Sequence, residues 1–329
     1  MTRWPHGFTM SLRILHYADV ERAPDDPELL ARLVGLVRER RDEETLVFGA
    51  GDNLGPGVLS LVTDSRHALD FFDAAEPDGD TFGNHDFDRG PEVTREVVAD
   101  SPMPWICANV HADGELFAAD EGVVPWTVLE TDEHRVGVTG VANPDTPDMN
   151  PDARGLTFAD PVSTAGEAVT ELRQREVDHV VVLSHCGDDT ALAEQLDVDV
   201  VLGGHAHEEY IDTVAGTLLV RAGSNASGLS EVVFEDRPRG YRLPTRDAPV
   251  AADLLDALDT RRLEAGLTDE VASLDEPVSV DRADTKQGES RVGNLVTDAY
   301  RWAANADIAV HSSGGLRPTD PLAGDVTAA

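Results

Sequence analysis

Five short polar motifs stand in a fixed order along the chain, and each follows an apolar run that predicts a β-strand. They read HYAD at 16–19, GDN at 51–53, GNHDFD at 83–88, SH at 184–185 and GGHAH at 203–207. Helical patterns separate the apolar runs, so the chain is predicted to alternate strand and helix. Loops after strand ends build the sites of open α/β folds, and we expect the motifs to meet there.

This alternation extends to about residue 236, where the composition becomes turn-rich. Up to that point, strands are predicted at 13–16, 45–48, 136–141, 178–183 and 198–202, and helices from 27, at 91–98 and at 160–176. A helix at 251–267 then precedes a predicted strand at 277–280, a helix at 290–305 and a strand at 307–310. One strand–helix–strand unit buries too little apolar surface to be stable alone.

The charge is strongly negative, with 63 Asp and Glu against 26 Lys and Arg, for a formal net charge of −37. Acidic residues are spread along the chain, and Lys286 is the only lysine. Self-repulsion should be severe in dilute buffer, whereas in about 1 M salt the screening length falls to roughly 3 Å. We therefore expect a halophilic protein, rather than a polyanionic surface for a basic partner, and no binding of long nucleic acids.

No run of about 18 uncharged apolar residues occurs, so no membrane span is predicted. Residues 1–19 lack the apolar region of a secretory signal, and two cysteines form no disulfide framework. These features predict a cytoplasmic protein. Cys186 stands beside His185, either as a soft metal ligand or as a small buried residue, and the second interpretation is favoured.

The Asp, Asn and His residues of the motifs are the ligand types of a two-metal hydrolytic centre. Asp52 is the predicted bridging carboxylate, because it follows a strand and a Gly-Ala-Gly turn that allows close access. A single histidine is more often a core or surface residue, but GGHAH directly after VDVVL favours ligands. The predicted ligands besides Asp52 are Asp19 and His207 for one metal, and Asn84, His185 and His205 for the other.

His85 lies beside Asn84 and is predicted to be the general acid, or the donor to phosphate oxygens in the transition state. A carboxylate should orient its ring, and both Asp86 and Asp88 are near. Asp88 is favoured for this role, while Asp86 is predicted to cap the following turn.

These residues resemble the calcineurin-like metallophosphoesterase superfamily and, more closely, its 5'-nucleotidase family. The resemblance covers 12–236 and resumes at 289–317, where ESRVGNLVTDA and SSGGLRP look like motifs of the family's C-terminal substrate domain. It implies an α/β fold: a four-layer sandwich of two central β-sheets flanked by helices, plus a partial α/β C-terminal unit. The implied domains are 1–236 for the catalytic part, 237–275 for a connector with a helix, and 276–329 for the partial C-terminal domain.

The resemblance also implies a function, the metal-dependent hydrolysis of phosphomonoesters by metal-bound hydroxide. Nucleoside 5'-monophosphates are the expected substrates, two divalent ions such as Mn or Zn the cofactors, and His85 with Asp88 the catalytic dyad. The alternatives are a 2',3'-cyclic phosphodiesterase, another ester hydrolase on the same centre, or a non-catalytic metal-binding remnant. Exposed apolar surface on the C-terminal unit makes a homodimer plausible.

The first motif departs from the family pattern Asp-x-His, because Glu21 stands where the histidine is expected. A carboxylate still binds divalent ions and would favour Mn²⁺ or Mg²⁺ over Zn²⁺. Glu21 is accordingly predicted to be a ligand, with an outward-turned surface residue as the alternative.

The C-terminal motifs depart as well. Ser312 occupies the place of an expected Asn, and Arg317 is kept as a candidate phosphate contact or a surface ion-pair partner. The family's aromatic clamp for the base is incomplete, since Tyr241, Tyr300 and Trp302 are the only Tyr or Trp residues after 234. Broad action on small phosphoesters is therefore expected.

Overall fold

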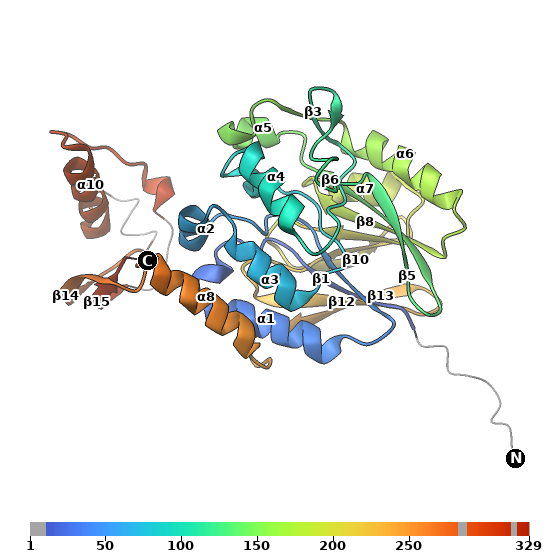
Figure 1. Ribbon diagram of the computed structural model, residues 1–329, viewed down its shortest axis with the longest axis horizontal. Coiled ribbons are helices and arrows are strands. Elements are labelled where there is room, and N and C mark those ends of the chain that lie inside the picture. Colours follow the sequence, from blue (N-terminus) through green and yellow to red (C-terminus); the bar gives the residue numbers. More distant parts are fainter. Residues whose placement is uncertain (1–10, 282–287, 317–320, 329) are drawn as a thin grey trace, which may run out of the picture. The chain divides into compact units, whose positions relative to one another are not determined.

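The computed structural model describes residues 11–281, 288–316 and 321–328 (Figure 1). The chain divides into two compact units, Met1–Arg261 and Arg262–Ala329, which we call unit 1 and unit 2. Among the described helices, none is long and apolar enough to cross a lipid bilayer. The domain limits expected from the sequence stay a prediction.

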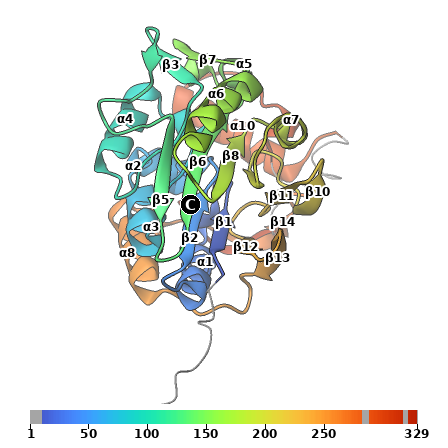
Figure 2. The same cartoon turned by 90° about the vertical axis from the view of Figure 1, so that its right-hand side faces the viewer.

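Two β-sheets form the centre of unit 1 (Figures 1 and 2). The first has the order β13 (Pro238–Pro244), β12 (Gly228–Phe234), β1 (Arg13–Tyr17) and β2 (Thr45–Gly49). The second has the order β10 (Tyr210–Val214), β11 (Thr217–Arg221), β9 (Val200–Gly203), β8 (His179–His185), β6 (Arg135–Ala142) and β5 (Trp126–Glu130). Strand β1 is parallel to β2, and β9 is parallel to β8, so in each sheet the motif-bearing strands end at the same edge.

The two sheets share one apolar core. Ile14 and Phe48 from the first sheet belong to the same fully buried cluster as Val181 and Val200 from the second. Alternate residues of these strands point to opposite faces, so each sheet also has an outer apolar face that must be covered.

Helices cover those outer faces. The six-stranded sheet contacts α6 (Pro161–Arg173) and α7 (Asp189–Gln195), with a second apolar cluster between them. The four-stranded sheet contacts α1 (Pro27–Arg40), which packs in turn on α3 (His67–Ala75). The layers therefore run helix, sheet, sheet, helix, which confirms the predicted four-layer sandwich. A small third sheet lies apart from these layers, in the order β4 (Glu115–Leu116), β3 (Val110–Ala112) and β7 (Leu156–Phe158).

Most elements expected from periodicity are present in unit 1. Strands β1, β2, β6, β8 and β9 and helices α1, α4 (Pro91–Asp100) and α6 confirm those predictions to within a few residues. The segment before GNHDFD differs, because residues 79 and 80 form only isolated bridges rather than a strand. Asp26 precedes α1 as expected, but its side chain makes no capping hydrogen bond.

Helix α8 (Ala252–Glu264) occupies most of the predicted connector helix, and its first ten residues belong to unit 1. Leu254 and Leu258 are buried. Asp253 binds the guanidinium of Arg38 at 2.7 Å, which fastens this helix to α1.

Unit 2 consists of the antiparallel pair β14 (Glu270–Val278) and β15 (Leu322–Thr327) together with α10 (Arg291–Ala304). The predicted strand at 307–310 is wrong, since the structure forms none there and leaves Ile308 79% and Val310 86% exposed. A β-strand needs a neighbour for its backbone groups. No described strand pairs with this segment, although its composition favours one.

Candidate metal centre

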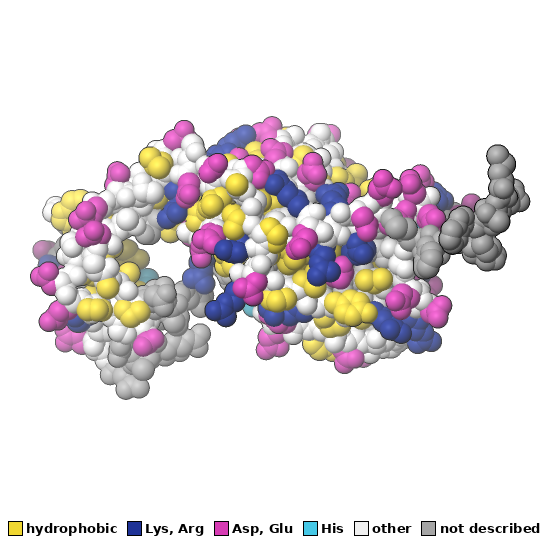
Figure 3. Space-filling model, turned by 90° about the horizontal axis from the view of Figure 1, so that it is seen from below, with side chains coloured by type: hydrophobic (Ala, Val, Ile, Leu, Met, Phe, Trp, Pro, Cys, Tyr) yellow, Lys and Arg dark blue, Asp and Glu magenta, His cyan; other side chains and the backbone are white. Residues whose placement is uncertain are grey.

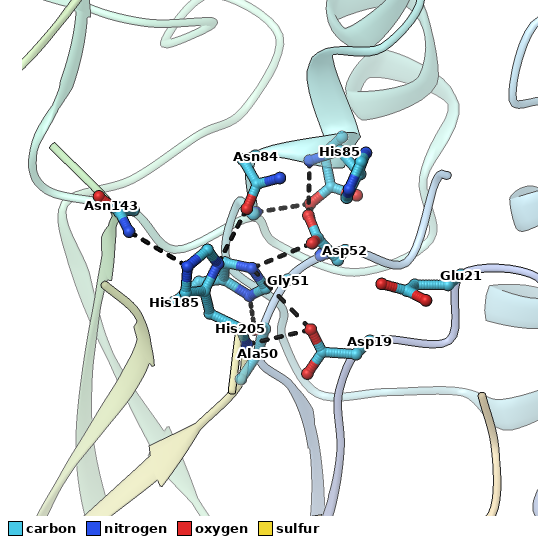
Figure 4. Close-up of polar contacts among 12 residues, drawn as sticks. Asp19, Glu21, Ala50, Gly51, Asp52, Asn84, His85, Asn143, His185 and His205 are labelled. Atoms are coloured by element: carbon cyan, nitrogen blue, oxygen red, sulfur yellow. Dashed lines mark hydrogen bonds and ion pairs between the residues drawn. The ribbon is translucent and has the colours of Figure 1, made fainter. Parts of the chain in front are cut away.

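Four of the five motifs follow the carboxyl ends of strands in the two central sheets. Asp19 follows β1 and Asp52 follows β2 in one sheet, whereas His185 ends β8 and GGHAH follows β9 in the other. His16 of the first motif joins the two sheets, because its ring nitrogens lie 3.4 Å from Phe48 O and 3.2 Å from Gly203 O. The motifs therefore meet where the two sheets face each other (Figure 4).

The loops carrying these residues are held in unusual backbone conformations. Asp19, Glu21, Asp52 and His205 have φ of 50°, 46°, 55° and 67°, in the left-handed region that residues with a Cβ avoid. Hydrogen bonds between the loops hold them there: Asp19 N donates to Gly51 O at 3.0 Å, and His205 N donates to Asp19 Oδ1 at 3.0 Å. Each such residue costs about 1–3 kcal/mol, and this kind of strain clusters at functional sites.

Asp19, Asp52 and His185 form the buried heart of the cluster. His185 Nε2 lies 3.2 Å from Asp52 Oδ2 and 4.0 Å from Asp19 Oδ1. His185 Nδ1 lies 2.7 Å from Ala50 O, which only accepts, so Nδ1 carries a proton and Nε2 faces the carboxylates. Asp19 Oδ2 and His185 Nε2 are buried without a hydrogen-bond partner among the described residues.

Burial and mutual repulsion shape the electrostatics of this cluster. Burial, reinforced by the Asp52 and Glu21 carboxylates, raises the pKa of Asp19 to about 7. Burial by itself lowers the pKa of His185, but Asp52 and Asp19 outweigh it and raise that pKa to about 10. A proton on His185 thus balances the buried carboxylates, and a cation bound at Nε2 would replace that proton.

Glu21 and His207 extend the cluster toward the surface. Glu21 Oε1 lies 3.0 Å from His207 Nε2, and Asp19 Oδ1 lies 3.7 Å from the same nitrogen. The Glu21 side chain is only 7% exposed, whereas that of His207 is 51% exposed. Glu21 therefore faces the cluster and not the solvent. Hydrogen bonding to Glu21 is the largest cause that raises the pKa of His207 above its ordinary value.

Asn84 and His205 lie together on the other side of the cluster. His205 Nδ1 is 3.0 Å from Asn84 Oδ1, and its Nε2 is 3.4 Å from Asn143 Nδ2. The His205 and His185 rings meet edge to face, with centroids 5.2 Å apart. Burial, reinforced by His185, lowers the pKa of His205, which favours the neutral ring that a metal ligand requires.

Within the described part of the chain, three sets of His and carboxylate side chains have their donor atoms within 4.8 Å of one another. All three sets draw on Asp19, Glu21 or Asp52, and His205 belongs to none of them. They are Asp19–Glu21–His207, Asp19–Asp52–His185 and Glu21–Asp52–His85.

His85 stands next to this cluster and is paired with Asp88. Its Nδ1 lies 2.9 Å from Asp88 Oδ2, and its backbone N–H donates to Asp52 Oδ1 at 2.6 Å. Burial opposes protonation of His85, but Asp88 and Asp52 outweigh it and raise the pKa to about 9. The carboxylate of Asp88 therefore favours the protonated form of His85.

The position of Asp86 in the sequence suggested that it caps the following turn, but the structure shows a different role. Its buried carboxylate accepts four backbone N–H groups: those of Gly83, Asp52, Asn53 and Leu54, at 2.7 to 3.0 Å. These amides come from two motifs, so Asp86 joins the Asp52 loop to the His85 loop. A sequence pattern does not reveal such a role, because the amides become neighbours only in the folded chain.

Two further residues support the site without having been predicted. Asn150 Nδ2 donates to Asn84 O at 2.7 Å and to Asp88 Oδ1 at 3.0 Å, which ties the dyad to the loop after β6. Asp80 is 0% exposed and accepts the N–H of Gly51 at 3.1 Å. Burial, reinforced by Asp86, raises the pKa of Asp80 to about 8.

Two of the remaining predicted residues belong to unit 2 or lie outside the described residues. Ser312 belongs to unit 2 and is exposed, while Arg317 lies outside the described residues. Substrate binding by these two stays a prediction. Cys186 is buried, with its Sγ 3.2 Å from Ser184 Oγ, and burial raises its pKa to about 11. A thiol that stays protonated fits the small buried residue better than a metal ligand.

Family models and proteins of known sequence resemble this chain. The family model for calcineurin-like phosphoesterases matches residues 12–209, and the model for the 5'-nucleotidase C-terminal domain matches residues 269–329. The chain is 25% identical over 371 residues to the trifunctional nucleotide phosphoesterase protein YfkN of Bacillus subtilis, covering 95% of this chain and 25% of that protein. It is 28% identical over 225 residues to human 5'-nucleotidase, covering 62% of this chain and 39% of that protein.

Solved structures agree. The 5'-nucleotidase precursor from Thermus thermophilus superposes with a TM-score of 0.78 at 25% identity, covering 97% of this chain and 72% of that one. The sulfate thiohydrolase SoxB of the same organism superposes with a TM-score of 0.73 at 18% identity, covering 90% of this chain and 69% of that one, which shows a shared fold alone. The chain spans well under half the length of the two curated relatives.

Proposed function

The chain belongs to the calcineurin-like phosphoesterase family, whose chemistry is metal-dependent hydrolysis of phosphoric esters, and we propose that its own substrates are phosphomonoesters, foremost nucleoside 5'-monophosphates. The proposed substrates are supported by relatives named 5'-nucleotidase and by the match of residues 269–329 to the model of the 5'-nucleotidase C-terminal domain.

One observation carries the proposal for the site. Asp19 Oδ2 is buried without a hydrogen-bond partner among the described residues, and it lies beside His185, whose Nε2 is 3.2 Å from Asp52 Oδ2. Buried polar atoms are normally bonded, and a buried unpaired charge is strongly destabilising. Carboxylate and imidazole donors suit ions such as Mn²⁺ or Zn²⁺. The residues present therefore fit divalent metal ions.

We assign Asp52 to the bridge between two ions. When bound, the ions would polarise the phosphoryl oxygens and lower the pKa of a water so that hydroxide forms near neutral pH. The remaining assigned ligands are Asp19, Glu21 and His207 for one ion, and Asn84, His185 and His205 for the other.

His85 is assigned to proton donation at the leaving or equatorial oxygen of the phosphate. Asp88 holds its Nδ1 at 2.9 Å and thereby directs Nε2 toward the substrate. The hydrogen bond to Asp88 favours the protonated form of His85, as a general acid requires. Asn84 holds the phosphate beside it.

The test is hydrolysis of AMP and p-nitrophenyl phosphate with Mn²⁺ in about 2–3 M KCl, where screening is nearly complete. EDTA-sensitive release of phosphate from both is expected. Turnover of bis-p-nitrophenyl phosphate instead would favour a diesterase. A folded, metal-loaded protein that hydrolyses neither ester would be the non-catalytic remnant. Equal losses in His85→Asn and in the exposed Asp298→Asn would contradict the role of His85.

We further propose that Glu21 is a ligand and shifts the first site toward Mn²⁺ or Mg²⁺, because its carboxylate faces His207 inside the cluster. Calorimetric titration should show Glu21→Ala binding Mn²⁺ at least tenfold more weakly, a loss of about 1.4 kcal/mol. Glu28→Ala, which alters an exposed pair with Arg32, is the matched control. Unchanged stoichiometry and affinity in Glu21→Ala would remove Glu21 from the ligand set.

Finally, we propose that the protein is halophilic. Acidic side chains are distributed over the whole face shown in Figure 3 and are not gathered at one site. With a formal net charge of −37, repulsion should lower the melting temperature steeply as KCl falls from molar to millimolar concentration. An unchanged melting temperature across that range would overturn this proposal.

A further inference from the structure

A cavity of about 390 Å³ opens directly beside the dyad, and its lining belongs entirely to unit 1. Asn84, His85 and Asp88 form one side of it. The rest of the wall comes from α2 (Val58–Thr63) with the turn before it, and from the segment 149–152 after α5 (Thr146–Met149). The cavity is therefore continuous with the candidate catalytic residues and borders the metal-ligand cluster through Asn84.

Part of the remaining lining is apolar. Leu61 from α2 and Met149 from α5 line the cavity together with Pro56 and Pro151. Leu61 is 58% and Met149 is 44% exposed, although most large hydrophobic side chains of unit 1 are buried. One exposed apolar residue needs no explanation. Two that line the same cavity from different elements make a surface that an apolar group would cover.

The charges around the cavity disfavour anions. Asp88 and Asp152 are in the lining, and the one arginine there, Arg89, is bound to Asp64 with nitrogen–oxygen distances of 2.6 and 3.0 Å. No guanidinium in the described lining is thus left to neutralise a carboxylate or a second phosphate. An uncharged group suits this lining better than an anionic one.

The direction of His85 links the cavity to the reaction. Asp88 holds Nδ1, so Nε2 is the nitrogen that can donate to an ester oxygen. A phosphate held by Asn84 with its ester oxygen at His85 places the organic group on the dyad side, which is the side where the cavity opens.

We propose that this cavity binds the leaving group of the phosphoester and that Leu61 and Met149 select it. The preferred substrates carry an uncharged, flat or apolar leaving group, and esters with an anionic leaving group are disfavoured. This inference rests on the proposed phosphomonoesterase function and names the part of the substrate that unit 1 itself recognises.

The experiment compares variants of the full chain on three esters: p-nitrophenyl phosphate, glycerol 2-phosphate and 3-phosphoglycerate. Leu61→Ser and Met149→Ser should each lower kcat/KM for p-nitrophenyl phosphate about tenfold, mainly through KM, with little change for glycerol 2-phosphate. Each variant is compared with the parent on the same ester, which removes differences in intrinsic reactivity. Val62→Ser is the matched control, since Val62 lies on α2, is 45% exposed and is absent from the lining.

A variant that gains activity on 3-phosphoglycerate distinguishes a change of specificity from loss of the fold. The parent should prefer glycerol 2-phosphate to 3-phosphoglycerate at least tenfold, roughly the discrimination expected for one mismatched group. Leu61→Arg should reduce that preference by supplying an unpaired guanidinium to the cavity. A parent without this preference, together with Leu61→Arg leaving the ratio unchanged, would overturn the proposal.

The remaining outcomes separate this proposal from the one on which it rests. Equal losses on p-nitrophenyl phosphate and glycerol 2-phosphate, or the same pattern in Val62→Ser, would overturn the subsite while leaving the phosphomonoesterase intact. A parent that releases phosphate from none of the three esters would overturn both.

Discussion

Unit 1 and unit 2 differ in how far their apolar side chains are buried. Unit 1 buries them in clusters on both faces of a six-stranded sheet, and its polar cluster sits at the edge of that dry interior. Among the described residues of unit 2, the buried apolar cluster consists of Val278, Val280 and Val292, and Trp302 is 87% exposed. A centre of buried carboxylates and imidazoles needs a rigid, water-poor surround. Only unit 1 provides one among the described residues, so its chemistry and its stability should be separable from unit 2.

The largest effect should come from the bridging carboxylate. Asp52→Asn should lower kcat/KM for p-nitrophenyl phosphate by about 10³-fold or more, because metal-bound charge stabilisation is worth several kcal/mol. Metal content measured on the desalted protein should fall with it. Asp298→Asn is the control from unit 2, where the carboxylate is exposed and pairs with Arg301. Similar metal content in the two variants would contradict a centre confined to unit 1.

The next effect concerns acid stability. Burial lowers the pKa of His67 to about 3, with Arg261 as a smaller cause. In the unfolded state, a histidine has a pKa near 6.5 and binds a proton that the buried side chain of the native state does not bind. The free energy of unfolding therefore falls as the pH drops from about 6.5 toward 3. At pH 4 the cost is about 3 kcal/mol.

His67→Leu should remove this part of the acid sensitivity. Chemical unfolding at pH 7 and pH 4, in constant high salt, measures the difference in free energy of unfolding between the two pH values. That difference should be smaller in the variant than in the parent. Equal differences would show that the interior of unit 1 does not exclude a charge at this position.

A smaller effect is expected at Asn150, which positions Asp88 and also borders the proposed leaving-group cavity. Asn150→Ala removes two hydrogen bonds, and the loss should lower kcat about tenfold with metal content unchanged. The acidic and basic limbs of the pH profile of kcat should also move, because Asp88 would hold His85 less firmly. Asn294→Ala in unit 2 is the control, and a matching loss there would contradict the positioning role.

The smallest effect on unit 1 should follow a disruptive change in unit 2. Val292→Asp puts a charge among the three buried valines and should unfold unit 2. If the two compact units unfold independently, the free energy of unfolding of unit 1, measured from the main melting transition, should change by less than about 1 kcal/mol. Val200→Asp, in the core between the sheets of unit 1, should abolish that transition. A comparable shift from Val292→Asp would show that the units fold as one.

Several features of the fold and site could be predicted from the order of residues alone. Apolar runs of strand length placed β1, β2, β8 and β9, because period and length are local properties of a sequence. Motifs at strand ends predicted that Asp19 and Asp52 would lie close together, since parallel strands end at one edge of a sheet. His185 joins them from the facing sheet. Asp88 was favoured over Asp86 as the carboxylate that orients His85, and the structure confirms that contact.

Other features depended on contacts between distant parts of the chain. Asp86 binds amides that lie some thirty residues away, and Asn150 reaches a dyad more than sixty residues away. The segment 307–310 has the composition of a strand but no partner in the described structure, because strand formation depends on a neighbour. The sequence by itself determines the side-chain types and the local periodicity of apolar residues. The partner of a buried polar group depends on which loops the tertiary fold brings together.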